Sequence, residues 1–389
     1  MIRRDRGMRI CAACTAAVLA VAAAGAPAAA ASPGPHGAEL RTALAELRAL
    51  GTTGAQGEIS IGRRETVARS GVADRVTGRP MPSDGHFRIG SNTKTFVSVV
   101  VLQLVGEGRL TLDDTVERWL PGVVTGNGND GRRITVRQLL QHTSGLYNYT
   151  RDLAALASAE EYRAHRLDHY DAADLVAIAM KHAPDFEPGE HWAYSNTNYV
   201  LAGMVIEAVT GHSWGSEVRS RIVRPLGLRD TSYPEDRAGL PRPFARTYQE
   251  FAPGAAAVDV TVFNPTVAGA AGGMVSTTDD LAAFWRGLES GRLLRPAQMA
   301  EMHRTVPAES LQDVLPGLRY GLGVFRVPND CGGFWGHPGD VPGTSTVNGV
   351  SPGGGKAVVV YRTTGFADDA RNGAADEIQY RLIGKVMCD

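Results

Sequence analysis

The sequence predicts an α/β fold of the α+β type: one antiparallel sheet built from both ends of the chain, flanking helices and a mostly helical insertion. Strand-like alternation of apolar and polar residues is concentrated near the two ends. Helical patterns dominate between positions 110 and about 260. The chain has 389 residues, more than one ordinary domain of roughly 100–200 residues. We therefore assign 32–109 and 262–389 to a sheet domain and 110–261 to a helical domain.

Residues 1–31 have the three-part pattern of a cleavable secretory signal. A basic leader with Arg3, Arg4 and Arg6 precedes an alanine-rich apolar run at 10–25, and small residues follow it. No other stretch is long and apolar enough to suggest a membrane span. We expect a secreted, extracellular protein that keeps no stable membrane span after cleavage.

Cysteine placement is consistent with export. Cys11 and Cys14 lie in the leader, so the mature chain keeps Cys331 and Cys388. An even pair in an oxidising compartment suggests one disulfide, which would tie the end of the chain to a strand near position 331. Two buried free thiols are the alternative.

Composition excludes some partners. The formal net charge is -1, whereas binding nucleic acid requires a basic surface. The chain is 43% hydrophobic, enough to form a sizeable core. We expect a monomer without nucleic acid, metal or cofactor.

The N-terminal part begins with a leucine stripe that predicts a helix at 38–50. Alternation predicts a strand at 58–70, and turn residues predict a loop at 71–85. A short strand at 87–90 leads into 91–105, which is apolar nearly all round. Such a segment predicts a helix buried in the middle of the protein.

The later elements follow from the same patterns. We expect helices at 112–120, 135–142, 198–210 and 376–387, strands at 320–327 and 331–339, and a hairpin of strands 344–350 and 356–362.

Ser91 and Lys94 are the first candidate catalytic pair. Spaced i and i+3 on a helix, they lie on one face. A serine hydroxyl needs a nearby base, and lysine serves as one only where burial lowers its pKa. The apolar helix would supply that burial. Alternatively, Ser91 is an ordinary helix cap and Lys94 is exposed.

Two further motifs carry polar groups suited to acyl transfer. Tyr194 can pass a proton to a leaving group, and Asn196 can hydrogen-bond a substrate carbonyl. His337 can add positive character near a carboxylate, and Gly339 allows a substrate backbone to approach closely. Taken singly, each motif is as easily a packed aromatic, a turn or a strand bend.

The combination of motifs makes a catalytic role the better interpretation. Each occurs once, and they follow one another in the order Ser-x-x-Lys, Tyr-x-Asn and His-x-Gly. With the segments 87–96, 134–147, 194–199, 224–228 and 321–323, the chain resembles the serine penicillin-recognising superfamily of D,D-peptidases, class C β-lactamases and related esterases. It looks most like the secreted D-alanyl-D-alanine carboxypeptidases of Streptomyces, which also have cysteines before the third motif and at the C-terminus. The resemblance covers about 40–388 and implies a β-lactamase/transpeptidase-like fold.

The resemblance also implies roles. Ser91 would form an acyl-enzyme, Lys94 would hold the proton network, and Tyr194 would carry the proton to the leaving amine. Asn196 would position the substrate amide, and His337 would stand where many relatives have lysine. The backbone N–H groups of Ser91 and of Asp340, which follows Gly339, would form the oxyanion hole.

Two departures weaken the carboxypeptidase expectation. That subgroup has hydroxyl residues where Pro338 and Asp340 stand, and Asp340 would repel a terminal carboxylate. The carboxylate-binding arginine best corresponds to Arg326, but Phe325 occupies the expected position. One step along a strand turns a side chain to the other face.

Two rival motifs are less persuasive. Ser213 lies in Gly-x-Ser-x-Gly, the nucleophile elbow of α/β-hydrolases, but a helix-like run precedes it instead of a strand. Gly211 suits a helix C-terminus and Ser213 the cap of the next helix. His165 and His169 have zinc-helix spacing but lack the glutamate of His-Glu-x-x-His, which favours a solvated face.

The sequence therefore predicts a secreted serine hydrolase that uses Ser91. A D-Ala-D-Ala cell-wall (peptidoglycan) peptide is the first-choice substrate. An ester or a D-amino-acid amide comes second and a β-lactam third. A penicillin-binding sensor with little turnover is the alternative from another class.

Overall fold

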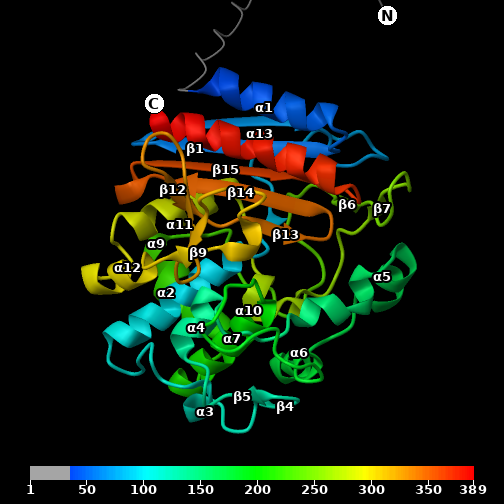
Figure 1. Cartoon of the computed structure of the whole chain (residues 1–389). Coiled ribbons are helices and arrows are strands. Elements are labelled where there is room, and N and C mark those ends of the chain that lie inside the picture. Colours follow the sequence, from blue (N-terminus) through cyan, green and yellow to red (C-terminus); the bar gives the residue numbers. More distant parts are fainter. Residues whose placement is uncertain (1–35) are drawn as a thin grey trace, which may run out of the picture. The chain divides into compact units, whose positions relative to one another are not determined.

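The structure is a computed structural model that describes residues 36–389. Within that part of the chain, a nine-stranded antiparallel sheet joins the two ends, because β1 (Gly54–Ile61) pairs with β15 (Lys356–Arg362) along its whole length (Figure 1). The strand order is β2 (Arg64–Gly71), β1, β15, β14 (Thr344–Val350), β12 (Phe334–Gly336), β11 (Phe325–Val327), β10 (Arg319–Tyr320) and β9 (Val306–Pro307), with β13 (Gly339–Val341) also on β14. The predicted fold class is confirmed.

Helices cover both faces of this sheet. Helices α1 (Gly37–Ala49) and α13 (Asp369–Cys388) pack on one face and α11 (Thr278–Glu289) on the other. Val358 and Val360 belong to the apolar cluster of α1 and α13, whereas Val359 belongs to the cluster of α11. Alternate side chains of β15 thus point to opposite faces of the sheet, and each set packs into a different apolar core.

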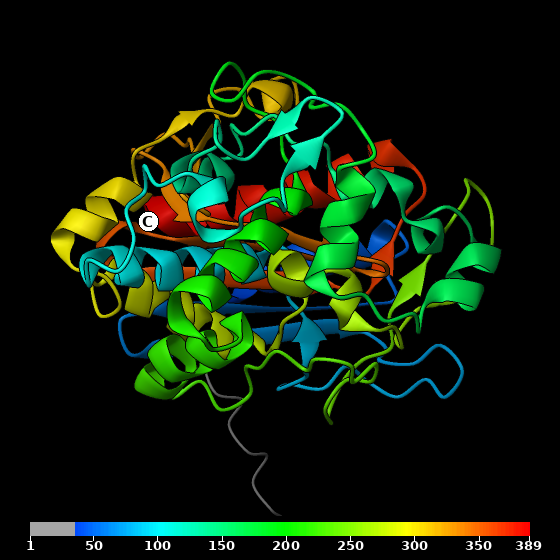
Figure 2. The same cartoon turned by 90° about the horizontal axis from the view of Figure 1, so that it is seen from below.

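Beyond α11 lies a helical layer centred on α2 (Asn92–Gly106), which packs on α7 (Asn196–Thr210) and α10 (Gly269–Gly272) (Figure 2). As its all-round apolar pattern predicted, α2 is buried along nearly its whole length. The other helices are α3 (Val116–Trp119), α4 (Val136–Gln141), α5 (Ala159–His165), α6 (Ala172–Ala179), α8 (Trp214–Val218), α9 (Arg224–Leu226) and α12 (Pro296–Met302).

Three small sheets complete the described part. They pair β3 (Phe87–Arg88) with β8 (Val275–Ser276), β4 (Thr125–Gly126) with β5 (Asn129–Asp130), and β6 (Tyr248–Gln249) with both β7 (Val258–Asp259) and β16 (Thr364–Gly365).

Three predicted strands are wrong in extent. The segment 58–70 is parts of two strands, β1 and β2, joined by a tight turn in which Gly62 has φ 59°. The segment 320–327 divides into β10 and β11 around glycines, and 331–339 divides into β12 and β13 at Pro338. In each case a turn divides a segment that the sequence pattern predicts to be one continuous strand.

The last helix begins earlier than the predicted range 376–387. The side chain of Asp368 accepts hydrogen bonds from the N–H groups of Ala370 and Arg371 and so caps α13. The expected hairpin at 344–350 and 356–362 has the predicted bounds.

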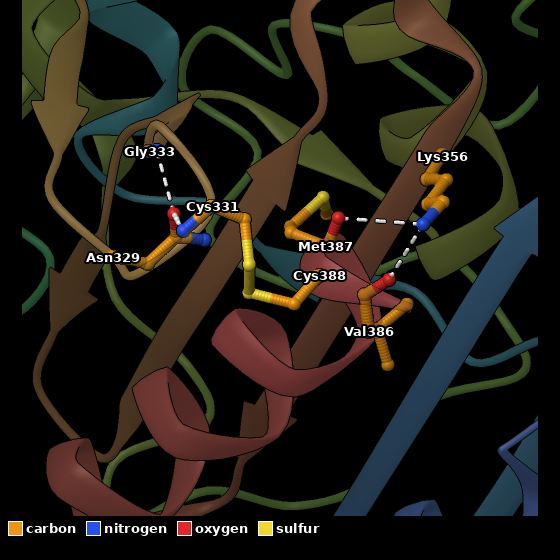
Figure 3. The surroundings of a disulfide bond; sticks show 7 residues. All are labelled: Asn329, Cys331, Gly333, Lys356, Val386, Met387 and Cys388. Carbon is orange, nitrogen blue, oxygen red and sulfur yellow. Dashed lines mark hydrogen bonds between the residues drawn. A yellow bond between two sulfur atoms is a disulfide. The ribbon is translucent and has the colours of Figure 1, made fainter.

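The end of α13 is fastened to the sheet in two ways (Figure 3). Cys331 and Cys388 form a disulfide, as the sequence predicted. The amine of Lys356 donates to the carbonyl oxygens of Val386 at 3.1 Å and Met387 at 3.3 Å. Both links hold the carboxyl end of the helix against β15 and the loop before β12.

Two predictions stay open. The division at 110 and 261 stays a prediction, because one apolar cluster includes residues from both proposed domains. The signal at 1–31 lies outside the described residues. In the described part, no helix combines the length and the apolar character needed to cross a membrane.

Candidate active site

Ser91 stands at the junction between β3 and α2. Gly90 has φ 51°, and this turn presents the serine at the first turn of the helix. The Ser91 side chain makes no capping hydrogen bond, so its hydroxyl is not committed to the helix. The alternative of a capping serine with an exposed lysine therefore fails, since Lys94 is also fully buried.

The Lys94 amine has three partners. Its Nζ lies 2.9 Å from Oγ of Ser91, 2.7 Å from Oδ1 of Asn196 and 2.6 Å from the carbonyl oxygen of Ala271 in α10. Burial lowers the pKa of Lys94 well below its usual range. A neutral amine has two hydrogens, which the carbonyl oxygens of Asn196 and Ala271 accept. Its lone pair is then left facing the Ser91 hydroxyl.

Tyr194 and Asn196 flank Ser195, the residue before α7, and reach the same point. The Tyr194 hydroxyl is hydrogen-bonded to Ser91, and burial raises its pKa well above the usual value, so the phenol keeps its proton. The Lys94 amine lies 4.8 Å from the centre of the Tyr194 ring. A charge on Lys94 would therefore be favoured beside the ring face.

His337 lies behind this group, buried between β12 and β13. Its Nδ1 is 2.6 Å from the carbonyl oxygen of Pro338, so that nitrogen carries the proton, and Nε2 accepts from the Tyr320 hydroxyl at 3.1 Å. Burial lowers the pKa of His337 to about 3. His337 is thus a neutral imidazole and does not supply the positive character expected of it.

The strand β13 passes directly against the Ser91 turn. A Cβ on Gly90 would lie 2.7 Å from the backbone nitrogen of Asp340, and a Cβ on Gly339 would overlap the carbonyl oxygen of Ile89. Only glycine fits at either position without moving the backbone. The two glycines bring the backbone N–H of Asp340 next to Gly90, the residue before Ser91.

A cavity of about 430 Å³ opens over these groups. Its lining includes the following residues of the motifs: Ser91, Tyr194, Asn196, His337, Pro338 and Asp340. Most of the remaining wall is apolar, from residues such as Tyr149, Leu153, Phe263 and Phe325. It suits a small substrate with an apolar group.

Arg326 does not line this cavity. Its guanidinium donates to the carbonyl oxygen of Gly332 and lies 5.1 Å from the ring centre of Trp335, its cross-strand neighbour on β12. Phe325, one position earlier on β11, lines the cavity instead. The alternation of side chains along the strand explains the exchange.

Comparison with known proteins places the chain in a family. The model of the family described as Beta-lactamase matches residues 18–381, most of the chain. The chain belongs to the beta-lactamase family. It is thereby a member of the beta-lactamase and transpeptidase-like superfamily of serine hydrolases.

Three known proteins resemble the chain over most of their length. A D-stereospecific amidohydrolase from Streptomyces sp. is 43% identical, with a TM-score of 0.80, over 87% of this chain and 97% of that one. D-amino acid amidase from Ochrobactrum anthropi is 29% identical, with a TM-score of 0.78, over 90% and 97%. Penicillin-binding protein 4 from Amycolatopsis lactamdurans is 28% identical over 82% of each chain.

Esterase EstB from Burkholderia gladioli is a more partial match. It is 35% identical over 54% of this chain and 53% of its own length. The match to Penicillin-binding protein 4* from Bacillus subtilis spans only 33% of that protein. The chain therefore covers about a third to a half of these two relatives.

Two residues that the sequence did not single out hold the family motifs together. The Asn348 side chain on β14 donates from Nδ2 to Oδ1 of Asn92 at 2.5 Å and to the carbonyl oxygen of His337 at 2.8 Å. It also accepts from the N–H of His337 at 3.2 Å. Asn348 thus joins the start of α2 to the third motif.

His142 is the second such residue. Its buried Nδ1 accepts from the N–H of Ser195 at 3.3 Å and from Nδ2 of Asn198 at 3.1 Å. Its ring lies 4.3 Å from that of Tyr194. His142 thereby holds the backbone between Tyr194 and Asn196. His142 ends the helix predicted at 135–142, with φ 60°, and the helical pattern does not indicate its contacts with Ser195 and Asn198.

The rival motifs have structural roles. Gly211 ends α7 with φ 76°, and the Ser213 side chain accepts from the N–H of Ser216 to cap α8, as the sequence analysis favoured. His165 pairs with Asp168 and His169 with Asp236. Among residues 36–389 there is no group of three or more ligating side chains placed to hold a metal.

Proposed function

We propose that this chain is a secreted serine amidohydrolase that cleaves small amides of D-amino acids through an acyl-enzyme on Ser91. The observation that carries the proposal is the make-up of the cavity beside Ser91, where Asp340, Phe325 and Pro338 stand together. A terminal carboxylate there would meet a carboxylate and two apolar side chains. An uncharged amide group avoids that repulsion.

Acylation follows from the hydrogen bonds at Ser91. Neutral Lys94 takes the hydroxyl proton as Oγ attacks the amide carbon. The N–H groups of Ser91 and Asp340 stabilise the oxygen that gains charge. Tyr194 gives its proton to the leaving nitrogen, the C–N bond breaks, and the proton held by Lys94 restores the phenol. Water then repeats the sequence on the ester and releases the acid.

The D-amino-acid class rests on the similar proteins. Two solved structures with this fold are described as a D-stereospecific amidohydrolase and a D-amino acid amidase, and both are covered almost completely. The cavity's apolar wall suits an aromatic or aliphatic side chain in the acyl part. Secretion rests on the leader pattern and is supported by the disulfide.

A D-Ala-D-Ala carboxypeptidase is the second candidate, favoured by Penicillin-binding protein 4, which matches over 82% of each chain. The cavity has one arginine to offer a carboxylate, Arg166 beside α5, and its Nη1 donates to the carbonyl oxygen of Arg163. The expected Arg326 is directed elsewhere. For this reason we rank the carboxypeptidase below the amidase.

The test compares four substrates with the mature protein and its Ser91→Ala variant. These are D-phenylalanine amide, L-phenylalanine amide, an acylated D-Ala-D-Ala dipeptide and a short-chain p-nitrophenyl ester. We expect the D-amide to be cleaved about 100-fold or more faster than the L-amide, and faster than the dipeptide. Faster cleavage of the dipeptide would establish the carboxypeptidase instead. Stable acylation by penicillin without turnover of any substrate would establish the sensor.

A further inference from the structure

A second cavity adjoins the one that contains Ser91. Its volume is about 440 Å³, and it lies between the loop before β10 and the exposed side of α13. The two cavities share Leu311, Phe325, Pro338 and Asp340. These four residues therefore form the junction through which a substrate longer than one residue would pass.

The second cavity is mainly apolar near this junction. Val314, Leu315, Leu318 and Val347 contribute to its wall. Val314 is 77% exposed, which is unusual for a large aliphatic side chain and places an apolar edge at the opening. The cavity therefore suits the apolar part of a substrate group.

Asp340 is the charged residue at the junction. Solvent still reaches its side chain, yet the surrounding protein raises the pKa of the carboxyl. Its hydrogen-bond partner is the Ser345 hydroxyl. In the described part of the chain, no basic side chain lies within ion-pair distance of it.

Arg362, whose charge lowers the pKa of Asp340, is held by other partners. Its guanidinium donates to the carbonyl oxygen of Thr364 at 2.6 Å, to Oδ1 of Asn372 at 3.2 Å and to Oδ1 of Asp376 at 3.5 Å. Asp340 thus keeps acceptor capacity that a ligand can use, and apolar walls strengthen the attraction of a cation placed there.

We propose that Asp340 is a specificity-determining residue that selects substrates carrying an ammonium group next to an apolar group. The inference rests on the proposed function and names the substrate class more closely. Two sources share this chemistry: the free α-ammonium of the acyl part, and an ammonium group on the amine that leaves. The amino group of a D-amino acid amide is the first of these.

The test measures kcat/KM for matched pairs in which a methyl group replaces the ammonium group. The acyl pair is D-phenylalanine amide and the 2-methyl-3-phenylpropanamide of the same configuration. The amine pair joins that neutral acid to ethylenediamine or to propylamine. The wild type should prefer the cation by about tenfold or more in one pair, which identifies the source of the ammonium group.

In Asp340→Asn the preference in that pair should fall to within about twofold of unity. The matched control is Asp113→Asn, which removes a carboxylate that is 84% exposed and paired with Arg137. The control should keep the wild-type preference. A wild type without preference in either pair, or an Asp340→Asn protein that retains it, overturns the proposal.

A measurement on the wild type alone removes dependence on the variant's folding. Inhibition by 2-phenylethylamine should be stronger than inhibition by 3-phenylpropanoate, and the reverse order overturns the proposal. If Ser91 is acylated by penicillin but no amide is cleaved, the amidase proposal fails. Ethyl esters of the acyl pair, with and without the ammonium group, then test Asp340 separately.

Discussion

The amine of Lys94 lies 2.9 Å from the hydroxyl of Ser91, and its other two contacts, Oδ1 of Asn196 and the carbonyl oxygen of Ala271, can only accept hydrogen bonds. A protonated lysine would donate to all three oxygens and leave no base for the serine. A neutral lysine directs its lone pair at Oγ. Function therefore depends on the protonation state of this one amine.

Activity should depend on pH through Lys94. Burial lowers its pKa well below 10.5, and the base form exists above that lowered value. We expect kcat/KM to rise with pH through the pKa of Lys94 and then to level. Lys94→Arg keeps a cation that cannot lose its proton and should lower kcat/KM by about 10²–10⁴. A Lys94→Arg enzyme with more than a tenth of wild-type activity would exclude the lysine base.

Labelling should separate the two candidate nucleophiles. Ser91→Ala should abolish covalent labelling by fluorescent penicillin, because the acyl bond forms on Oγ of Ser91. Ser213→Ala should label normally and lose only about 1 kcal/mol of stability, since Ser213 caps α8. Gel fluorescence and thermal unfolding measure both effects. Labelling that persists in Ser91→Ala would reject the assignment.

Gly339→Ala should damage catalysis more than stability. The new Cβ would overlap the carbonyl oxygen of Ile89 and lie 2.5 Å from Nδ2 of Asn92, so β13 must move away from Ser91. We expect kcat to fall by about 10²-fold as the Asp340 N–H leaves its place.

Gly384→Ala is the control: nothing lies within 4 Å of its added methyl group on α13. The Gly384→Ala variant should keep the wild-type kcat, and its free energy of unfolding should rise by up to about 1 kcal/mol. An unaffected kcat in Gly339→Ala would show that β13 does not contribute to the oxyanion site.

His142 should act as a positioning residue for Tyr194 and Asn196. In His142→Asn, Oδ1 can replace Nδ1 as the acceptor for the Ser195 N–H, and asparagine tolerates φ 60°. In His142→Leu no acceptor remains. We expect the leucine variant to lose roughly 10–100-fold in kcat with little change in KM, while the asparagine variant keeps most activity. Equal losses in the two variants would indicate that ring packing, and not the hydrogen bond, matters.

Reduction of the disulfide should weaken the fold. Cys331 and Cys388 are separated by 57 residues, and opening such a loop costs about 2–4 kcal/mol of unfolding free energy. Denaturant unfolding with and without a reducing agent measures the difference. The Cys331→Ser/Cys388→Ser double variant should match the reduced protein and ignore the reductant. If mass spectrometry finds two free thiols in the untreated protein, the disulfide prediction is wrong.

Local sequence patterns predicted many of the helices and strands. The apolar run at 91–105 predicted a buried helix, and α2 occupies Asn92–Gly106. The glycine-rich turn at 351–355 marked the hairpin of β14 and β15 with its bounds. Period-2 alternation also predicted one strand at 58–70, but the two-residue turn at Gly62 pairs Ile61 with Arg64 and so shifts the alternation by one position between β1 and β2.

The polar supports of the site could not be found in the same way. Asn348 contacts Asn92 and His337, and His142 contacts Ser195, yet each pair is distant in the chain. Asn348 falls in the predicted strand 344–350 and His142 in the predicted helix 135–142, but those patterns do not indicate which distant groups the two side chains contact. Their roles exist only because β14 and the end of α4 pack next to the motifs.

By itself, the sequence determined which groups are available for the chemistry: a serine, a lysine one helical turn later and a tyrosine, each in a motif present once. The tertiary structure decided their states and their neighbours. Burial makes Lys94 a base and keeps His337 neutral, and the parity of β11 turns Arg326 away and brings Phe325 to the cavity beside Asp340. Protonation and direction depend on surroundings drawn from distant segments, and those surroundings exist only in the folded chain.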